Sequence, residues 1–509
     1  MRAEQRWVGL ASGIVGRALR FFAGFVITTA CLRAFGSATW GTVVIALTAT
    51  ELLLFADFAT PELCAYEAAR ANDHAELRAR LGQALWLVVG PTVLISSLLL
   101  TAAQLTPHWF QGSAADGRTL RALLIACAFS APWALGANCL GSALQGLGRL
   151  REMNTMHALS GLVELGLVLV LLALRCDVVH VQWARSAAQV GRLLSMLLVF
   201  RRLGLAVPVP LAPQRPVLRE MVRYCAGLSL LKIIGNAIGR SAVPMSQWFT
   251  TTAVIGSYDA VDRLGGVLQR ASNPVSDSLF QRFVRSFDGS ASDTQRSSGR
   301  RDFLAGTLLV VGISASATLL TLNLSAWLFP LWLGRDLARD PIVFAPWVMA
   351  NWALGLSVSM CGALLIARAQ IRACIWVHVL ALAATSATIL SVGMHARMHG
   401  HDGRYALLAG PLSGAVVAAA GMTVLACRSA GIPLRHFLAH VSAVWAPAWL
   451  AMAVVRLWPH TIVTVLSTAL GLVAIAIIAV CAEPLRSLRR EFRQYSIVPE
   501  RSHGGGPAE

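Results

Sequence analysis

Apolar stretches of about 20 residues follow one another along almost the whole chain, and short polar stretches separate them. A helix needs about 20 mostly apolar residues to cross the hydrocarbon core of a bilayer. The apolar residues are continuous within each stretch, whereas the strands of a membrane β-barrel alternate apolar and polar residues. This pattern predicts an all-α polytopic membrane protein with about 14 transmembrane helices. The helices are expected at residues 8–31, 40–60, 81–104, 119–143, 156–175, 181–200, 225–247, 250–277, 303–330, 342–366, 373–394, 405–427, 438–457 and 462–482.

A weak internal repeat and a proline-rich loop indicate how these helices are grouped. Residues 39–43 (Thr-Trp-Gly-Thr-Val) and 254–258 (Val-Ile-Gly-Ser-Tyr) each precede the acidic residues of a helix. The loop 201–223 contains four prolines and is typical of a linker between two halves. We therefore predict two six-helix lobes, related by an axis along the membrane normal, and two further helices. The predicted domains are an N-terminal lobe (1–205), a C-terminal lobe (206–430), two additional helices (431–485) and a cytoplasmic tail (486–509).

Composition and charge exclude a soluble domain and predict an orientation in the membrane. Of the 509 residues, 56% are hydrophobic and 13% are charged, whereas soluble domains carry about 25% charged residues. The net charge is +18, almost wholly from arginine, and Lys232 is the single lysine. The arginines concentrate in alternate loops, which follows the positive-inside rule, so both termini are expected in the cytoplasm. No cleavable signal peptide is expected, because Arg17 and Arg20 interrupt the first apolar stretch.

Charged residues inside the apolar stretches cluster in the first two helices of each half. An ionised side chain in hydrocarbon costs about 2.5–3.5 kcal/mol even on lenient scales, so these groups should face water or one another. Their matching positions predict one polar cavity between two lobes, which is typical of a transporter. The residues are Arg17, Arg20, Glu51 and Asp57 in the first half, and Lys232, Arg240, Asp259, Asp262, Arg263 and Arg270 in the second.

The cationic members of this group are candidates for binding a phosphate-bearing substrate. Arg17 and Arg20 are three residues apart and share one helix face. A guanidinium group binds phosphate through two parallel hydrogen bonds, so a phosphate suits this pair. Pairing with Glu51 or Asp57, or snorkelling to the membrane surface, is the alternative. The candidate pyrophosphate- and sugar-binding residues are Arg17, Arg20, Lys232, Arg240 and Arg270.

The acidic members are candidates for charge balance or ion coupling. Asp259 and Asp262 could bind Na⁺ or a proton that drives transport. A salt-bridge network is the alternative, because Asp259 and Arg263 are four residues apart on one helix. Lys232 needs either an acid or a substrate anion, and Glu164 and Arg192 are interpreted as a structural pair. The candidates for charge balance or coupling are Glu51, Asp57, Asp259 and Asp262.

No catalytic residue, cofactor or resident metal is expected. His395, His399 and His401 have the spacing of a metal-binding tract, but a polar external loop is the simpler interpretation. The phosphate-binding loop of ATPases, G-x-x-x-x-G-K-[ST], does not occur in the sequence. The longest expected external loop, 105–118, contains one acid, Asp116, which disfavours a membrane glycosyltransferase or polymerase.

Three short motifs stand in a defined order along the chain. They are residues 32–41 (Leu-Arg-Ala-Phe-Gly-Ser-Ala-Thr-Trp-Gly), 144–149 (Leu-Gln-Gly-Leu-Gly-Arg) and 256–264 (Gly-Ser-Tyr-Asp-Ala-Val-Asp-Arg-Leu). They resemble the turn after helix one, the loop after helix four and the start of helix eight in bacterial polysaccharide (O-antigen) flippases. These flippases belong to the multidrug/oligosaccharidyl-lipid/polysaccharide exporter superfamily. The chain departs from the family pattern at Trp40, where Tyr or Phe is usual, and at Arg240, where many relatives carry an acid.

The resemblance covers nearly the whole chain and implies two facing six-helix bundles, with helices one, two, seven and eight lining a cleft that opens alternately to either side. It implies a flippase, not an enzyme, in the bacterial inner membrane. The substrate would be undecaprenyl-pyrophosphate-linked oligosaccharide, moved to the periplasmic leaflet for the biosynthesis of lipopolysaccharide or another surface polysaccharide. Expected partners are this lipid-linked oligosaccharide, membrane lipids and other polysaccharide-assembly membrane proteins, but no nucleic acid, and the chain is expected to be a monomer.

Three other functions remain open at this point. Two belong to the same superfamily: a drug or cation exporter and a peptidoglycan-precursor flippase. A drug exporter should have acidic cavity walls, whereas the charges here are of mixed sign and lean basic. The third is of another class, a membrane glycosyltransferase or polymerase.

Overall fold

The computed structural model describes residues 3–54, 57–71, 73–110, 112–205, 209–287, 292–368, 370–458 and 461–481. Over these residues the chain is all-α, as the apolar pattern predicts, and each of the fourteen expected segments lies mostly in helix. Ten helical spans in this part of the chain are long and apolar enough to cross a membrane. The chain is therefore a multi-pass membrane protein.

Several expected spans are divided differently in the structure. The first expected span and most of the second lie in one long helix, α1, whereas the seventh consists of α7 with the short α8, and the tenth of α11 with α12. The helices are α1 (Ala3–Leu54), α2 (Thr60–Arg70), α3 (His74–Trp109), α4 (Ala114–Gly146), α5 (Leu150–Ala173), α6 (Val178–Arg202), α7 (Arg215–Arg240), α8 (Ala242–Ser246), α9 (Thr252–Ser286), α10 (Asp293–Leu333), α11 (Arg339–Ser357), α12 (Ser359–Ala367), α13 (Ile371–Met398), α14 (Arg404–Ala430), α15 (Leu434–Leu457) and α16 (Thr461–Cys481).

The chain folds into two compact units. The first comprises Met1–Arg270, Ser325–Asn351 and Ile371–Ala418. The second comprises Ala271–Leu324, Trp352–Gln370 and Ala419–Glu509. The predicted lobe boundaries after residues 205 and 430 stay a prediction.

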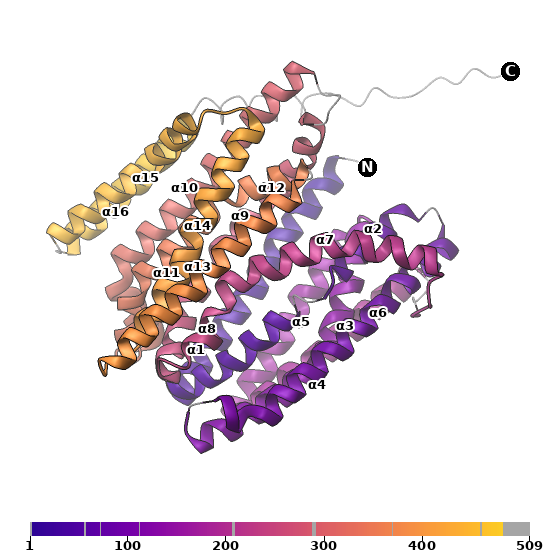
Figure 1. Ribbon diagram of the computed structural model, residues 1–509, viewed down its shortest axis with the longest axis horizontal. Helices are drawn as coiled ribbons and strands as arrows, with labels where there is room; N and C mark the ends of the chain where they lie inside the picture. The colour runs from indigo at the N-terminus through magenta and orange to yellow at the C-terminus, as the bar shows by residue number, and fades with distance from the viewer. Residues whose placement is uncertain are drawn as a thin grey trace. The chain divides into compact units, whose positions relative to one another are not determined.

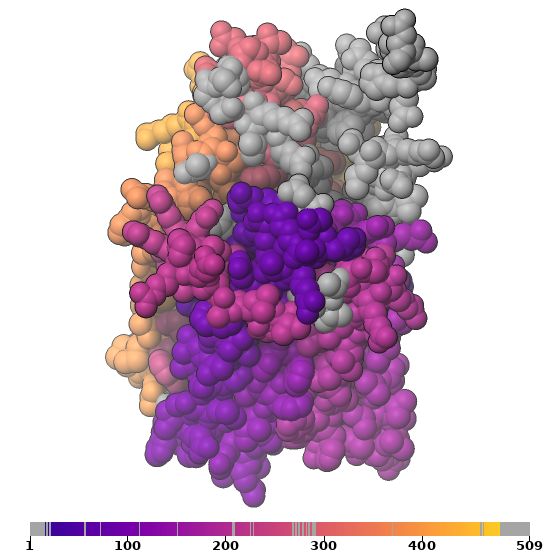
Figure 2. Space-filling view, turned by 90° about the vertical axis from the view of Figure 1, so that its right-hand side faces the viewer, coloured from indigo at the N-terminus to yellow at the C-terminus, as the bar shows by residue number. Residues whose placement is uncertain are grey.

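In the first unit the N-terminal helices form a bundle. Helix α5 packs on α1, α4 packs between α3 and α6, and α2 packs on α4 (Figure 1). Helix α7 reaches this bundle through the segment that precedes it, because the backbone N–H of Leu211 donates to the carbonyl of Gly82 in α3 at 2.9 Å. Figure 2 shows the dark purple residues of α2 and early α3 against the magenta segment that leads into α7.

Two glycines of the sequence motifs have clear structural reasons. Gly36 bends α1, with φ of 79° and ψ of 168°, a conformation that is essentially restricted to glycine. Gly41 lies where α1 crosses α9, because a Cβ there would stand 1.7 Å from the carbonyl oxygen of Thr252. Gly256 faces it, since a Cβ there would stand 2.2 Å from the carbonyl oxygen of Ser37. The two copies of the predicted repeat therefore pack on each other through small residues.

The second expected helix is interrupted next to Asp57. Helix α1 ends at Leu54 and α2 begins at Thr60, while Phe58 and Ala59 adopt left-handed conformations with φ of 53° and 51°. The Asp57 side chain accepts a hydrogen bond from the backbone N–H of Ala59 at 2.9 Å, which stabilises the turn. Pro61 then fits the first turn of α2, where no backbone N–H is needed.

This interruption changes the interpretation of the residues that follow it. The sequence predicts a short amphipathic cytoplasmic helix over residues 61–80. In the structure α2 ends at Arg70 and buries one side against α4, and α3 begins at His74.

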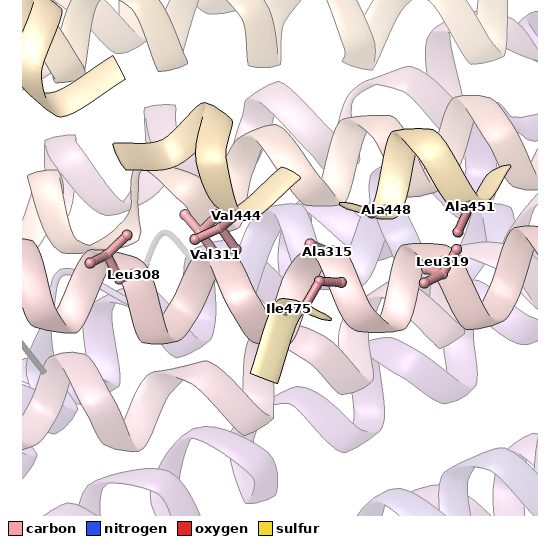
Figure 3. Close-up of a cluster of buried hydrophobic side chains, with 8 residues drawn as sticks. All are labelled: Leu308, Val311, Ala315, Leu319, Val444, Ala448, Ala451 and Ile475. Carbon is pink, nitrogen blue, oxygen red and sulfur yellow. The ribbon is translucent and has the colours of Figure 1, made fainter. Parts of the chain in front are cut away.

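In the second unit, α10 packs against the hairpin of α15 and α16. The cluster joins leucine, valine and alanine side chains of α10 to small side chains of α15 and to Ile475 of α16 (Figure 3). Gly471 brings α16 close, because a Cβ there would lie 2.7 Å from the Leu319 side chain. A hydrogen bond of 2.9 Å from Asn323 to Thr468 adds a polar contact between α10 and α16.

Candidate substrate-binding site

Lys232, in the middle of α7, contacts two acids beside the helix interruption. Its Nζ lies 2.9 Å from Asp57 Oδ2 and 3.0 Å from Glu62 Oε1. The Asp57 side chain is 7% exposed and the Glu62 side chain 45% exposed. Of the two partners predicted for Lys232, an acid or a substrate anion, the structure shows acids. One of them, Glu62, was not among the residues expected from the sequence.

Arg240, at the end of α7, has the same kind of surroundings. Its Nε lies 3.1 Å from Glu51 Oε2 and its Nη1 lies 3.4 Å from Asp262 Oδ2. The Asp262 side chain is 13% exposed and the Glu51 side chain 45% exposed. Lys232 and Arg240 therefore each hold one acid that is largely buried and one that is half-exposed. Lys232 and Arg240 are eight residues apart, about 12 Å along the helix, and lie close to one face.

Asp259 of α9 belongs to a network that joins α9 to α1. Its Oδ2 accepts hydrogen bonds from Arg263 Nε at 2.7 Å and from Trp40 Nε1 at 3.0 Å. The Arg263 guanidinium also lies 5.6 Å from the centre of the Trp40 ring. The predicted pairing of Asp259 with Arg263 is confirmed. Trp40, one of the departures from the family pattern, supplies an indole N–H that Tyr or Phe could not place there.

The structure describes the backbone but not the side chains of three candidate cations. Arg17 and Arg20 lie in α1 and Arg270 in α9, but their side chains are outside the described part of the structure. Their predicted contact with a substrate stays a prediction.

A cavity of about 530 Å³ joins the two cation clusters of α7. Polar side chains of α4 and α5 form its opposite wall, and the sequence interpretation missed all of them. Asn138, Ser142 and Gln145 of α4 recur every three or four residues and so share one helix face. That spacing is visible in the sequence, but three neutral polar residues at the end of an apolar stretch are only weak evidence for a binding site. The polar and charged residues of the lining are Glu51, Asp57, Asn138, Ser142, Gln145, His157, Lys232 and Arg240.

A second polar cavity of about 330 Å³ adjoins the first and shares Glu51, Leu54 and Asn138 with it. It lies among α1, α4, α5, α6 and α9. Glu164 pairs with Arg185 Nε at 2.7 Å, so the partner found for this acid is Arg185, where Arg192 was expected. Arg192 donates to Asn138 Oδ1 at 2.9 Å.

The lining of the two cavities contains more cations than acids, although three acids outside the lining, Glu62, Asp259 and Asp262, also contact these cations. Among the described lining residues, five are cationic and three are acidic. The cations are Lys232, Arg185, Arg192, Arg240 and Arg263, and the acids are Glu51, Asp57 and Glu164. Such a lining can bind an anionic group, since charge-assisted hydrogen bonds from guanidinium and ammonium groups favour carboxylates and phosphates.

The histidines of the predicted external loop lie at the end of α13 and just beyond it. His399 Nδ1 is 2.8 Å from the carbonyl oxygen of His395, which occupies one ring nitrogen locally. Within the described ranges, no group of three or more His, Cys, Asp or Glu side chains could hold a metal ion.

The fold of this chain is shared with solved membrane transporters. No protein-family model matches the chain, and no curated protein matches it. A structure of the lipid II flippase MurJ in an inward closed conformation superposes with a TM-score of 0.69 at 10% identity, over 94% of this chain and 99% of that one. An inward-facing multidrug resistance MATE family transporter of the MOP superfamily gives 0.63 at 13% identity, over 82% and 98%. The MATE multidrug transporter DinF-BH, in complex with R6G, gives 0.54 at 12% identity, over 83% and 95%.

These likenesses show that the chain shares its overall fold with these transporters. The chain has the fold of a flippase and of MATE transporters, and it covers almost the full length of each of these structures.

Proposed function

We propose that this chain is a flippase that moves undecaprenyl-pyrophosphate-linked oligosaccharide across the bacterial inner membrane. It would act by alternating access, as a monomer that is not an enzyme, with both termini in the cytoplasm and other polysaccharide-assembly membrane proteins as partners. The fold supports transport, and MurJ, one of the proteins that share this fold, is a flippase of lipid II. The observation that carries the proposal is that Lys232 and Arg240 line one cavity and that each holds a half-exposed acid, which an anion could replace.

The pairing of the α7 cations indicates how an anion could enter. An exposed ion pair contributes about 0–1 kcal/mol, so the half-exposed partners Glu62 and Glu51 are inexpensive to replace. The more buried acids Asp57 and Asp262 stay and hold each cation in place. A pyrophosphate would take the positions of the exposed carboxylates, with Arg17, Arg20 and Arg270 as further candidates. Glu51, Asp57, Asp259 and Asp262 would balance charge or bind a coupling Na⁺ or proton.

The proposal is tested by transport in proteoliposomes, measured as the access of a leaflet-specific probe to the lipid-linked oligosaccharide. Lys232→Gln with Arg240→Gln should lower the rate by about 10-fold or more, because each charge-assisted hydrogen bond is worth about 1.5–3 kcal/mol. Arg404→Gln is the matched control, since Arg404 also pairs with two acids, Asp340 and Asp402, and lines neither cavity.

Two results of this assay would contradict parts of the proposal. Wild-type protein that moves no lipid-linked oligosaccharide would overturn the function itself. Equal rates in the double variant and the control would show that Lys232 and Arg240 do not bind the substrate. Arg17→Ala with Arg20→Ala tests the predicted role of that pair in the same way.

A peptidoglycan-precursor flippase is the second candidate. It is favoured by the MurJ structure, which this chain matches over 99% of the MurJ chain. Lipid II in the same assay separates the two: faster transport of lipid II than of other lipid-linked oligosaccharides would favour this candidate.

A further inference from the structure

An apolar groove of about 870 Å³ opens between α3 and α7 beside the helix interruption. Its walls are formed by large side chains, among them Trp86, Val89 and Leu94 of α3, and Leu230 and Ile233 of α7. Its two hydroxyl groups are already bonded within the protein. Thr60 Oγ1 donates to the carbonyl of Asp57, and Ser229 Oγ donates to the carbonyl of Cys225. The groove therefore offers a ligand an essentially apolar lining.

The groove and the charged cavity share a wall. Around the interruption, Asp57 and Pro61 line the cavity while Phe58 and Thr60 line the groove. On α7, Lys232 lines the cavity and the next residue, Ile233, lines the groove. A lipid whose anionic head lies in the cavity would therefore have the start of its apolar chain close to the groove.

We infer that this groove holds the polyprenyl tail of the transported lipid while its pyrophosphate occupies the charged cavity. The inference rests on the proposed function and extends it to the part of the substrate that never enters the polar cavity. Apolar burial is worth about 0.8 kcal/mol per methylene group, so a long tail in the groove would add to the affinity of the head. The occupant is the tail of the substrate, because its head has charge complementarity with the adjoining cations.

Gly90 of α3 gives a variant that fills the groove. It lines the groove, and a Cβ at this position would have no atom within 4 Å. Gly166 of α5 is the matched control, since it is exposed, has equally free space at its Cβ and lines neither the groove nor the cavities. Gly90→Phe and Gly166→Phe therefore make the same chemical change in two helices, one inside the groove and one outside it.

The experiment measures transport of one oligosaccharide pyrophosphate carried on an undecaprenyl chain or on a short citronellyl chain. Gly90→Phe should lower the undecaprenyl rate by about 10-fold or more, because each excluded methylene group corresponds to a factor of about 4. It should leave the citronellyl rate within about twofold of wild type, and Gly166→Phe should change neither rate. Equal loss for both lipids, or no loss for either, overturns the inference while the proposed function stands. Wild-type protein that moves neither lipid overturns both.

A second measurement distinguishes the substrate tail from bulk membrane lipid. A photoreactive amino acid in place of Leu94, in the groove, should crosslink to added undecaprenyl-linked oligosaccharide in preference to phospholipid. The same residue in place of the exposed Val163 of α5 should crosslink to phospholipid. Phospholipid as the main product at both positions overturns the inference.

Discussion

Lys232 and Arg240 lie on one helix, and each is held by a pair of acids that differ in exposure. Asp57 and Asp262 are the more buried partners, and Glu62 and Glu51 are the more exposed ones. Removing one partner of a buried ion pair leaves an uncompensated charge, whereas an exposed ion pair contributes little. The four acids should therefore have unequal effects on stability even though all four contact a cation.

The Lys232 cluster gives a direct comparison of two acids. Asp57→Asn should lower the free energy of unfolding by up to about 3 kcal/mol, because Lys232 keeps only a half-exposed partner. Glu62→Gln should change it by less than about 1 kcal/mol. Thermal unfolding in nanodiscs measures both variants against wild type. Losses of equal size would show that burial does not distinguish the two acids.

Local pairs could be predicted from the sequence, but pairs between helices could not. Asp259 and Arg263 are four residues apart, and helix geometry alone brings them together. The contacts of Arg240 with Glu51, and of Lys232 with Glu62, join α7 to α1 and α2 and depend on packing. In the sequence Trp40 is only a departure from a motif, and its hydrogen bond to Asp259 required the structure.

At the level of helices, two interruptions lie near the ends of the second span and position its charged residues. Gly36 turns the chain in the middle of α1, and the turn at Asp57 to Ala59 separates α1 from α2. Discontinuous helices in transporters form binding sites where backbone groups line a cavity. Here the second interruption lies beside the charged cavity on one side and the apolar groove on the other.

The bend at Gly36 can be tested with two substitutions in one helix. Gly36→Ala should destabilise the protein by about 1–3 kcal/mol, because alanine at this φ and ψ is strained. Gly24→Ala should stabilise it by about 0.5–1 kcal/mol, because Gly24 is helical and its Cβ position is empty. Thermal unfolding of both variants is the measurement. Effects of the same sign would contradict the strain attributed to Gly36.

The spans could be predicted from apolar length, but their interruptions could not. Each expected segment lies mostly in helix, because the bilayer requires backbone hydrogen bonds to be satisfied within the segment. The turn at Phe58 and Ala59 uses left-handed conformations at residues that are neither glycine nor asparagine, so no residue type announces it. Pro61 marks only the start of the next helix.

At the scale of the whole molecule, proteins with very different sequences share this arrangement of apolar helices. The chain shares its fold with MurJ and MATE structures at 10–13% identity. The order of apolar spans was accessible from the sequence, whereas the close approach of Gly41 to Gly256 was not, because the sequence only aligns these two positions as copies of a repeat. The two adjoining cavities were not, because polar residues of α4, α5 and α6 meet the charges of α7 and α9 only after packing.

The proposed mechanism is that a pyrophosphate replaces the half-exposed acids at Lys232 and Arg240. It predicts a gain of affinity when these acids are neutralised, because the anion then has no carboxylate to displace. The gain should be up to about fivefold for each acid, which corresponds to an exposed ion pair of up to about 1 kcal/mol.

The most direct measurement is equilibrium binding of undecaprenyl-pyrophosphate-linked oligosaccharide to purified wild-type protein and to the Glu51→Gln, Glu62→Gln double variant. Glu152→Gln is the control, since Glu152 also pairs with an arginine, Arg149, and lines neither cavity. The account predicts tighter binding by the double variant and an unchanged Kd for the control. Weaker or unchanged binding by the double variant would contradict it.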